Sequence, residues 1–194
     1  MTLVEFISPW KVEEDAVQRK RIELTFETVS HLRFENFLEM GCDTGFLTQK
    51  LSGVCSKMTA VDISSSAIAY AKKTKSLVNV DWIVADFTQF DISKNAFNGI
   101  SFVECLYYFD DPTRDRLLRA AYNGLKSGGY FLFGAPVKQP KKKWDYDESR
   151  YFDSPTDMIR LISKSGFKIR DEKVTVSLPG WIQKIRNYVI LAQK

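Results

Sequence analysis

Short runs of apolar residues alternate with stretches of helical periodicity along most of this chain. A short apolar run bounded by turn residues is typical of a buried strand, whereas apolar residues three or four positions apart indicate one face of a helix. NFLEM at 36–40 therefore predicts a strand, and GFLTQKLS at 45–52 predicts a helix that begins at a glycine turn. The same pattern predicts further strands at 57–63, 80–85, 99–105, 129–136, 167–178 and 187–193, and further helices at 12–33, 64–75, 111–126 and 154–166.

Residues at the element boundaries support this division. A serine cap precedes the helix at 64–75, and Pro112 and Pro155 fall in the first turns of two later helices. Gly166 ends the last helix, and the two strands that follow are expected to pair antiparallel to each other. Alternating strands and helices predict a doubly wound α/β fold with right-handed crossovers. We therefore expect a mostly parallel, seven-stranded Rossmann-like sheet with an antiparallel final strand.

Composition narrows the class of protein. The 194 residues are enough for one domain, and 44% hydrophobic with 27% charged residues is a globular composition. No apolar run approaches the roughly 20 residues of a membrane helix, so we expect no membrane association. The N-terminal sequence lacks the pattern of a signal peptide, and three cysteines without metal-ligand spacing suit a reducing compartment, so we expect a cytoplasmic protein. No metal site is expected.

The charge pattern argues against a nucleic-acid surface. The net charge is +4, and the one dense basic cluster, KQPKKKW at 138–144, is followed at once by acidic residues. A nucleic-acid surface needs a broader basic stripe with interleaved stacking aromatics. A solvated loop explains the cluster better.

Polar residues gather where the predicted parallel strands end, which is where ligands bind in such sheets. The first strand ends in EMGCDTG, whose Gly41 and Gly45 permit a close backbone approach, and the next helix begins there. The second strand ends at Asp62, 21 residues after Gly41, a spacing suited to a carboxylate that binds ribose hydroxyls. Asp86 and Phe87 follow the third strand, and Glu104, Tyr107 and Tyr108 follow the fourth.

Each of these residues also has a purely structural explanation. A glycine pair is often only a turn, Asp62 alone could cap the helix at 64–75, Asp86 could cap a turn, and Glu104 could be a surface acid. Four successive strand ends, however, carry the expected residue type in the expected order. That coincidence favours a nucleoside-binding site.

The arrangement resembles the Rossmann-like (class I) S-adenosylmethionine-dependent methyltransferases. Their loop is E/D-x-G-x-G-x-G, and here Glu39, Gly41, Asp43 and Gly45 occupy its defined positions, with aspartate in place of the middle glycine. LKSGG at 125–129 is similar to their LKPGG. An NAD enzyme fits less well because its G-x-G-x-x-G spacing is absent. The resemblance implies S-adenosyl-L-methionine as cofactor, held by Trp10, Glu39, Gly41, Cys42, Asp43, Gly45, Asp62, Ile63, Asp86, Phe87 and Glu104.

The nodulation protein S family is the branch that the chain resembles most. SPWKVEEDAVQRKRIELT at 8–25, CLYYFDD at 105–111 and GAPV at 134–137 with the later KKKW carry this likeness. Those enzymes N-methylate the free amine of a deacetylated chitin-type oligosaccharide. The resemblance implies one methyltransferase domain with a helical lid at 1–33, a cofactor-binding core at 34–136 and a substrate side at 137–194. Trp10 would belong to the lid, or would anchor a loop on the core.

Methyl transfer to an amine requires a neutral nitrogen, so a carboxylate or phenol near the acceptor could hold it and take its proton. We expect Glu104 in that role, with Tyr107 and Tyr108 orienting the acceptor or facing the sulfonium, although core packing of one of the two rings is an alternative. His31, the only histidine, is expected to be structural. Aromatic residues of an open acceptor site for a small molecule or oligosaccharide are expected at Trp144, Tyr146, Tyr151 and Trp181.

Two other functions remain open from the sequence. One is O-methylation of a small metabolite, which often uses a histidine or a metal. The other is a non-catalytic relative of the fold, an option that Asp43 raises because it replaces a loop glycine. S-adenosylmethionine carries no phosphate, so an aspartate near its positive groups is electrostatically tolerable. A positive φ at position 43 is also less costly for aspartate than for most residues. We expect a working cofactor loop in a monomer or homodimer.

Overall fold

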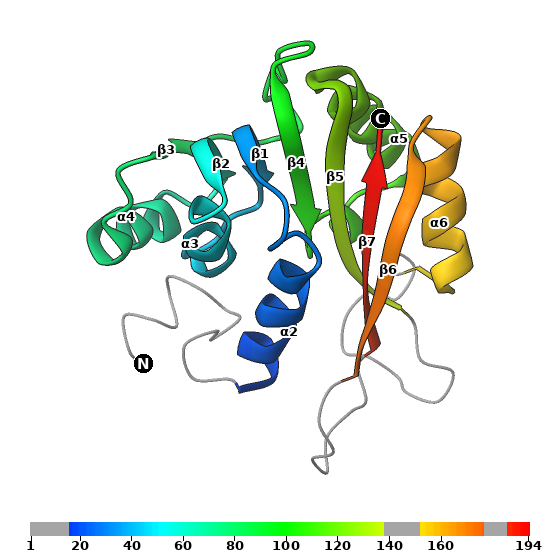
Figure 1. Cartoon of the computed structure of the whole chain (residues 1–194), viewed down its shortest axis with the longest axis horizontal. Coiled ribbons are helices and arrows are strands. Elements are labelled where there is room, and N and C mark those ends of the chain that lie inside the picture. Colours follow the sequence, from blue (N-terminus) through cyan, green and yellow to red (C-terminus); the bar gives the residue numbers. More distant parts are fainter. Residues whose placement is uncertain (1–15, 138–151, 177–185) are drawn as a thin grey trace.

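Figure 1 shows the computed structural model, which describes residues 16–137, 152–176 and 186–194. Its centre is a seven-stranded sheet in the order β3-β2-β1-β4-β5-β7-β6. The elements in chain order are α2 (Ala16–Glu27), β1 (Phe34–Met40), α3 (Phe46–Ser52), β2 (Cys55–Asp62), α4 (Ser65–Lys75), β3 (Val80–Val84), β4 (Phe97–Val103), the 3-10 turn η1 (Leu106–Tyr108), α5 (Asp111–Gly124), β5 (Leu125–Val137), α6 (Pro155–Lys164), β6 (Lys168–Val176) and β7 (Arg186–Gln193).

The strand pairing confirms the predicted doubly wound sheet. β1 pairs in parallel with β2 on one side and with β4 on the other, and β3 and β5 extend these parallel pairs outward. β7 runs antiparallel to both β5 and β6, so it is the antiparallel final strand. The chain direction of the crossovers reverses between β1 and β4, and a doubly wound sheet binds its ligand at that point.

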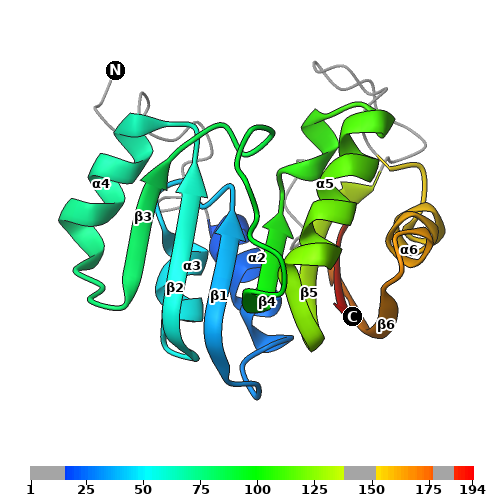
Figure 2. The same ribbon diagram turned by 90° about the horizontal axis from the view of Figure 1, so that it is seen from above.

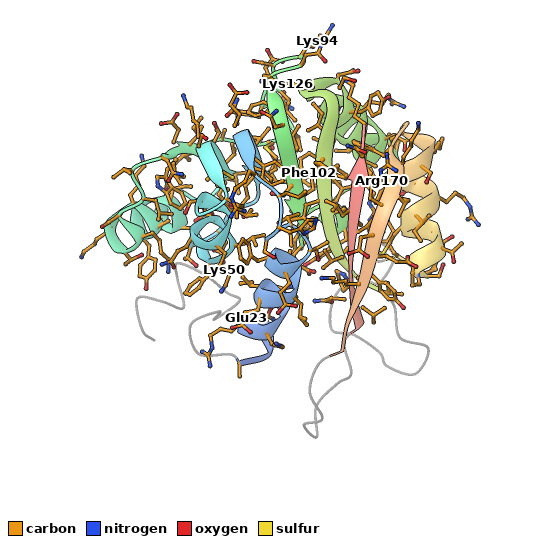
Figure 3. The ribbon with its side chains drawn as sticks, in the orientation of Figure 1. Glu23, Lys50, Lys94, Phe102, Lys126 and Arg170 are labelled. Carbon is orange, nitrogen blue, oxygen red and sulfur yellow. The ribbon has the colours of Figure 1, made fainter. Side chains whose placement is uncertain are left out.

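Helices cover both faces of the sheet because the strands are apolar on both sides. α2, α3 and α4 pack on one face, where Leu51 and Ile68 belong to a buried cluster with strand residues. α5 and α6 pack on the other, where Leu118 and Ile162 are completely buried. Figure 2 shows α5 in front of the sheet with α2 and α3 behind it. Phe102 of β4 is completely buried in the cluster that includes residues of α5 and α6. Lys94 and Lys126 lie at the end of the sheet opposite α2 (Figure 3).

The first predicted helix is shorter than its periodicity indicated. Its predicted start lies outside the described residues, and it ends at Glu27 rather than at residue 33. The amides of Thr28 and Val29 donate to the carbonyls three residues earlier, which tightens the chain into a turn. Val29 is nevertheless completely buried. It matches the helical spacing because it packs in the core just beyond the end of the helix.

Several strand boundaries also differ from prediction, and those of β4 and β5 have a clear structural cause. β4 covers Phe97–Val103 instead of 99–105, because the chain leaves the strand conformation at Glu104 with a positive φ of 58°. β5 begins at Leu125, immediately after α5, instead of at 129. Leu125 already pairs with Phe97, and the register then shifts through the glycines of LKSGG. Glu104 thus follows β4 directly at its carboxyl end.

No helix in the described parts of the chain is long and apolar enough to cross a bilayer.

Candidate cofactor and acceptor site

The loop after β1 is built from left-handed backbone. Gly41, Asp43 and Gly45 have φ angles of 79°, 47° and 80°. A Cβ on Gly45 would lie 2.6 Å from the Trp82 ring, and one on Gly41 would lie 3.0 Å from Cβ of Cys105. Both glycines are therefore required by space as well as by conformation. Position 43 does adopt a positive φ, and aspartate is among the residues that tolerate it best.

Asp62 holds this loop in place. Its Oδ2 accepts from the backbone N–H of Asp43 at 2.8 Å, and its Oδ1 accepts from the N–H of Ser64 at 2.9 Å. The helix cap that the sequence allowed for Asp62 is instead the Ser64 hydroxyl, which accepts from the amide of Ala67 at 3.2 Å. A carboxylate oxygen has room for a second donor. Asp62 can therefore order the loop and still accept from a ligand hydroxyl.

Glu39 is a buried acid beneath the loop. Its Oε2 accepts from the Thr48 hydroxyl at 2.6 Å, and only 3% of the residue is exposed. Burial raises the pKa of its carboxyl to about 8; the Thr48 hydrogen bond opposes this and the charge of Asp62 adds to it. Glu39 is thus mostly neutral near pH 7 and supports the loop as a hydrogen-bonding group. Burial also raises the pKa of the Cys42 thiol, as expected of a small core residue.

Predicted residues at the end of β3 form the more open side of the site. Asp86 is exposed, and its Oδ1 accepts from the amide of Thr88 at 2.8 Å, so the turn cap that the sequence allowed is present. Phe87 is half-buried and packs edge-on against Phe109, with ring centroids 5.2 Å apart. Ile63, after β2, is 66% exposed. An apolar side chain, a ring edge and an acid at this rim are suited to a flat heterocycle.

Glu104 lies at the end of β4 and faces α2. One of its oxygens is 2.8 Å from Nη1 of Arg21, and each side chain is less than a fifth exposed. Burial raises the pKa of the Glu104 carboxyl above its usual value, and the Arg21 guanidinium opposes that shift. The amide of Glu104 donates to the carbonyl of Gly134 at 2.7 Å, which fixes the backbone in its left-handed conformation. Glu104 is therefore a held, inward-facing acid, and the surface-acid alternative is wrong.

The two predicted tyrosines occupy different environments. Tyr107 is buried and lines the same cavity as Glu104, whereas Tyr108 is 42% exposed. The Tyr107 hydroxyl donates to that of Tyr108 at 3.2 Å. Burial, reinforced by Glu104, raises the pKa of the Tyr107 phenol, so that it stays protonated in ordinary buffers. Tyr107 can orient a bound group but is poorly suited to act as a base.

These residues enclose a cavity of about 100 Å³ between α2, the glycine loop and the end of β4. Figure 1 shows α2 beside the carboxyl end of β4. Glu39, Asp43 and Glu104 are its acidic lining residues, and Arg21 is its one basic residue in the described parts of the chain. The cavity thus joins the predicted cofactor loop to the predicted acceptor side.

A sequence model of the family described as nodulation protein S (NodS) matches residues 4–163, well over half of the chain. The chain belongs to the nodulation protein S family. It is 30% identical to nodulation protein S of Sinorhizobium fredii over 144 residues, which cover 71% of this chain and 65% of that protein. The corresponding identity to the Rhizobium tropici protein is 28%, over 59% of its length. The matched part thus spans less than two thirds of these two relatives.

The fold comparison agrees with this family. The crystal structure of the N-methyltransferase NodS from Bradyrhizobium japonicum, in complex with S-adenosyl-L-homocysteine, superimposes with a TM-score of 0.78. The comparison covers 95% of this chain and 91% of that one, at 21% identity. The predicted Rossmann-like methyltransferase fold is therefore confirmed.

Arg21 is the main site residue that the sequence did not single out. It lies on the NodS-like N-terminal segment, four residues before Thr25 and next to Ile22, and all three line the cavity. Because residues four apart share a helix face, an arginine in register with a buried threonine was a usable signal. The apolar positions that predict the helix do not include Arg21.

Arg114, also not anticipated, fixes the turn that carries Tyr107. It is 6% exposed, and its guanidinium donates to the carbonyls of Leu106 and Tyr107 at 3.2 and 3.1 Å. The same group packs over the ring of Phe152. A buried cation from α5 thus holds η1 in place behind the cavity.

Several predicted site residues lie outside the described residues, namely Trp10, Trp144, Tyr146, Tyr151 and Trp181. Their predicted roles stay predictions. His31 is exposed in the turn after α2. In the described parts of the chain, no three histidine, cysteine or acidic residues converge in a way that could hold a metal ion.

Proposed function

We propose that this protein is an S-adenosylmethionine-dependent methyltransferase that N-methylates an amine on a small molecule or an oligosaccharide. The observation that carries this proposal is the buried acid Glu104, held at the end of β4 across from a loop with three left-handed residues. Membership of the nodulation protein S family supports it. So does the complex of a structural relative, itself an N-methyltransferase, with S-adenosyl-L-homocysteine.

The residues present fit the cofactor. Gly41 and Gly45 give the loop its left-handed turns and pack closely against Cys105 and Trp82, which sets the shape of the loop at the end of β1. Asp62 could accept from the ribose hydroxyls, and Ile63, Asp86 and Phe87 could border the adenine. The acidic lining suits a ligand with a sulfonium and an ammonium group, so Asp43 does not oppose binding as it would oppose a phosphate. When bound, S-adenosylmethionine supplies an electrophilic methyl group.

Glu104 would hold the acceptor amine and take up its proton, directly or through water. An amine attacks only through its free lone pair, so a protonated acceptor must lose a proton first. Burial favours proton uptake by Glu104, whereas Arg21 stabilises its ionised form. The protonated Tyr107 hydroxyl would orient the acceptor as a hydrogen-bond donor or acceptor. Positioning of this kind supplies much of the rate enhancement of a group transfer.

The acceptor class follows from the family resemblance, with the free amine of a glucosamine oligomer as the first candidate. Its N-acetylated counterpart is the matched control, because acetylation delocalises the nitrogen lone pair into an amide and leaves the sugar chain unchanged. Transfer of a radiolabelled methyl group from S-adenosylmethionine is expected to the free amine and not to the acetylated oligomer. Transfer only to phenols or carboxylic acids would show O-methylation instead. A lack of transfer to all three acceptor types would count against this acceptor class.

A further inference from the structure

Arg21 and Glu104, which both line the cavity, form an ion pair between elements far apart in the sequence. Nη1 of Arg21 lies 2.8 Å from a Glu104 oxygen, with both groups mostly buried. The cavity itself measures about 100 Å³. Pockets for small molecules usually measure roughly 300–1,000 Å³. The cavity is thus smaller than a whole cofactor, and it lies where the amino-acid end of one would reach the Arg21–Glu104 pair.

The guanidinium has donor capacity beyond this pair. Nε of Arg21 is buried and has no hydrogen-bond partner within the described residues. A buried donor without a partner is costly, and an arginine presents its five N–H groups as a fork that matches a carboxylate. Arg21 is thus prepared for a second, bidentate acceptor that Glu104 does not provide in this arrangement.

The charges around the cavity identify that acceptor. Glu39, Asp43 and Glu104 would repel an added carboxylate if ionised, and Arg21 is the only basic side chain among the described lining residues. The amino-acid end of S-adenosylmethionine carries one carboxylate and one ammonium. The acidic side chains that line the cavity would attract the ammonium group. We therefore place the carboxylate against the guanidinium of Arg21.

We propose that Arg21 exchanges Glu104 for the methionine carboxylate of the cofactor, so that Glu104 becomes available to the acceptor amine only after the cofactor has bound. This inference rests on the function proposed above. Glu104 is suited to such a change because its backbone is already fixed by the bond to Gly134, so only its side chain must change partner. The exchange gives an ordered reaction in which an unloaded enzyme does not hold the acceptor in the reactive position.

Calorimetric titration with two ligands tests the exchange. S-adenosyl-L-homocysteine has the carboxylate, and its decarboxylated analogue keeps the amine but lacks the carboxylate. Arg21→Gln is expected to weaken S-adenosylhomocysteine roughly ten- to hundredfold and to leave the analogue unchanged. Glu104→Gln is expected to strengthen S-adenosylhomocysteine roughly three- to tenfold, because no charged partner must be displaced. In the Arg21→Gln background, Glu104→Gln is expected to have no effect on this affinity.

Two further variants separate binding from folding. Arg21→Lys keeps the charge without the fork and is expected to show an intermediate loss. Arg19→Gln removes an exposed arginine of the same helix and is expected to bind like the unmodified protein. An equal loss for both ligands in Arg21→Gln, or weaker S-adenosylhomocysteine binding in Glu104→Gln, would overturn the exchange while leaving the proposed function intact. If the unmodified protein binds neither ligand, the proposed function fails and the exchange fails with it.

Discussion

Replacing Glu39 with glutamine is expected to change how the stability of the protein depends on pH. Glu39 is 3% exposed, and its pKa rises from 4.5 to about 8 in the folded protein. Between these values the unfolded chain loses the proton while the folded chain keeps it. The free energy of unfolding of the unmodified protein therefore falls as the pH rises from about 4.5 to about 8.

The size of the effect follows from the two pKa values. Each pH unit within the window costs about 1.4 kcal/mol, and the change from about pH 5 to about pH 7.5 sums to about 3 kcal/mol. Glutamine cannot ionise, and its carbonyl can still accept from the Thr48 hydroxyl. The Glu39→Gln variant should therefore gain about 3 kcal/mol relative to the unmodified protein over that interval. This is a large part of the 5–15 kcal/mol typical of a domain.

Urea unfolding followed by tryptophan fluorescence at the two pH values measures this difference. Glu35→Gln is the matched control, because Glu35 lies on the same strand but is exposed and paired with Lys126 at 2.9 Å. That pairing lowers the pKa of Glu35, so any effect of its replacement has the opposite sign and appears at low pH. A stability difference between Glu39→Gln and the unmodified protein that is the same at both pH values would refute the reasoning.

Other substitutions address the loop and the acceptor side. Glu104→Ala should abolish methyl transfer while S-adenosylhomocysteine still binds in calorimetry, and normal turnover would remove Glu104 from the acceptor site. Asp43→Gly should retain cofactor affinity. Asp43→Val should lower the free energy of unfolding by roughly 1–2 kcal/mol, because a branched side chain resists the positive φ. Equal melting temperatures of Asp43→Val and the unmodified protein would contradict this. Arg114→Leu should cost about 2–3 kcal/mol in urea unfolding, because the carbonyls of Leu106 and Tyr107 lose their donors. A loss below about 0.5 kcal/mol would show that those carbonyls find other partners.

The fold was predictable because the central parallel strands, β1 and β4, are largely buried on both faces and so appear as apolar runs. Leu38 and Ile100, for example, are completely buried at the centres of neighbouring strands. Such runs are recognisable without knowledge of their partners. The residues at the strand ends were also recognisable from the sequence. Gly45 has to adopt the backbone conformation of the loop, and Asp62 has to accept a hydrogen bond from it.

The rest of the site depended on contacts that no local pattern encodes. Arg21 becomes a site residue only because α2 packs beside the end of β4, and nothing near Arg21 in the sequence specifies Glu104 as its partner. The boundary of β4 was missed for a related reason: Glu104 adopts a left-handed backbone that its residue type disfavours. Strain of this kind depends on the surrounding structure and is concentrated at functional sites.

One measurement tests most directly whether the edge between β1 and β4 is a cofactor site. It is the calorimetric titration of the unmodified protein and of Asp62→Ala with S-adenosyl-L-homocysteine. Asp62 accepts from the Asp43 amide and is the proposed partner of the ribose. The unmodified protein is expected to bind one ligand per chain with micromolar affinity. Asp62→Ala is expected to bind at least about tenfold more weakly, a loss of about 1.4 kcal/mol. No detectable binding at millimolar ligand, or equal affinity in the two proteins, would contradict this assignment of the site.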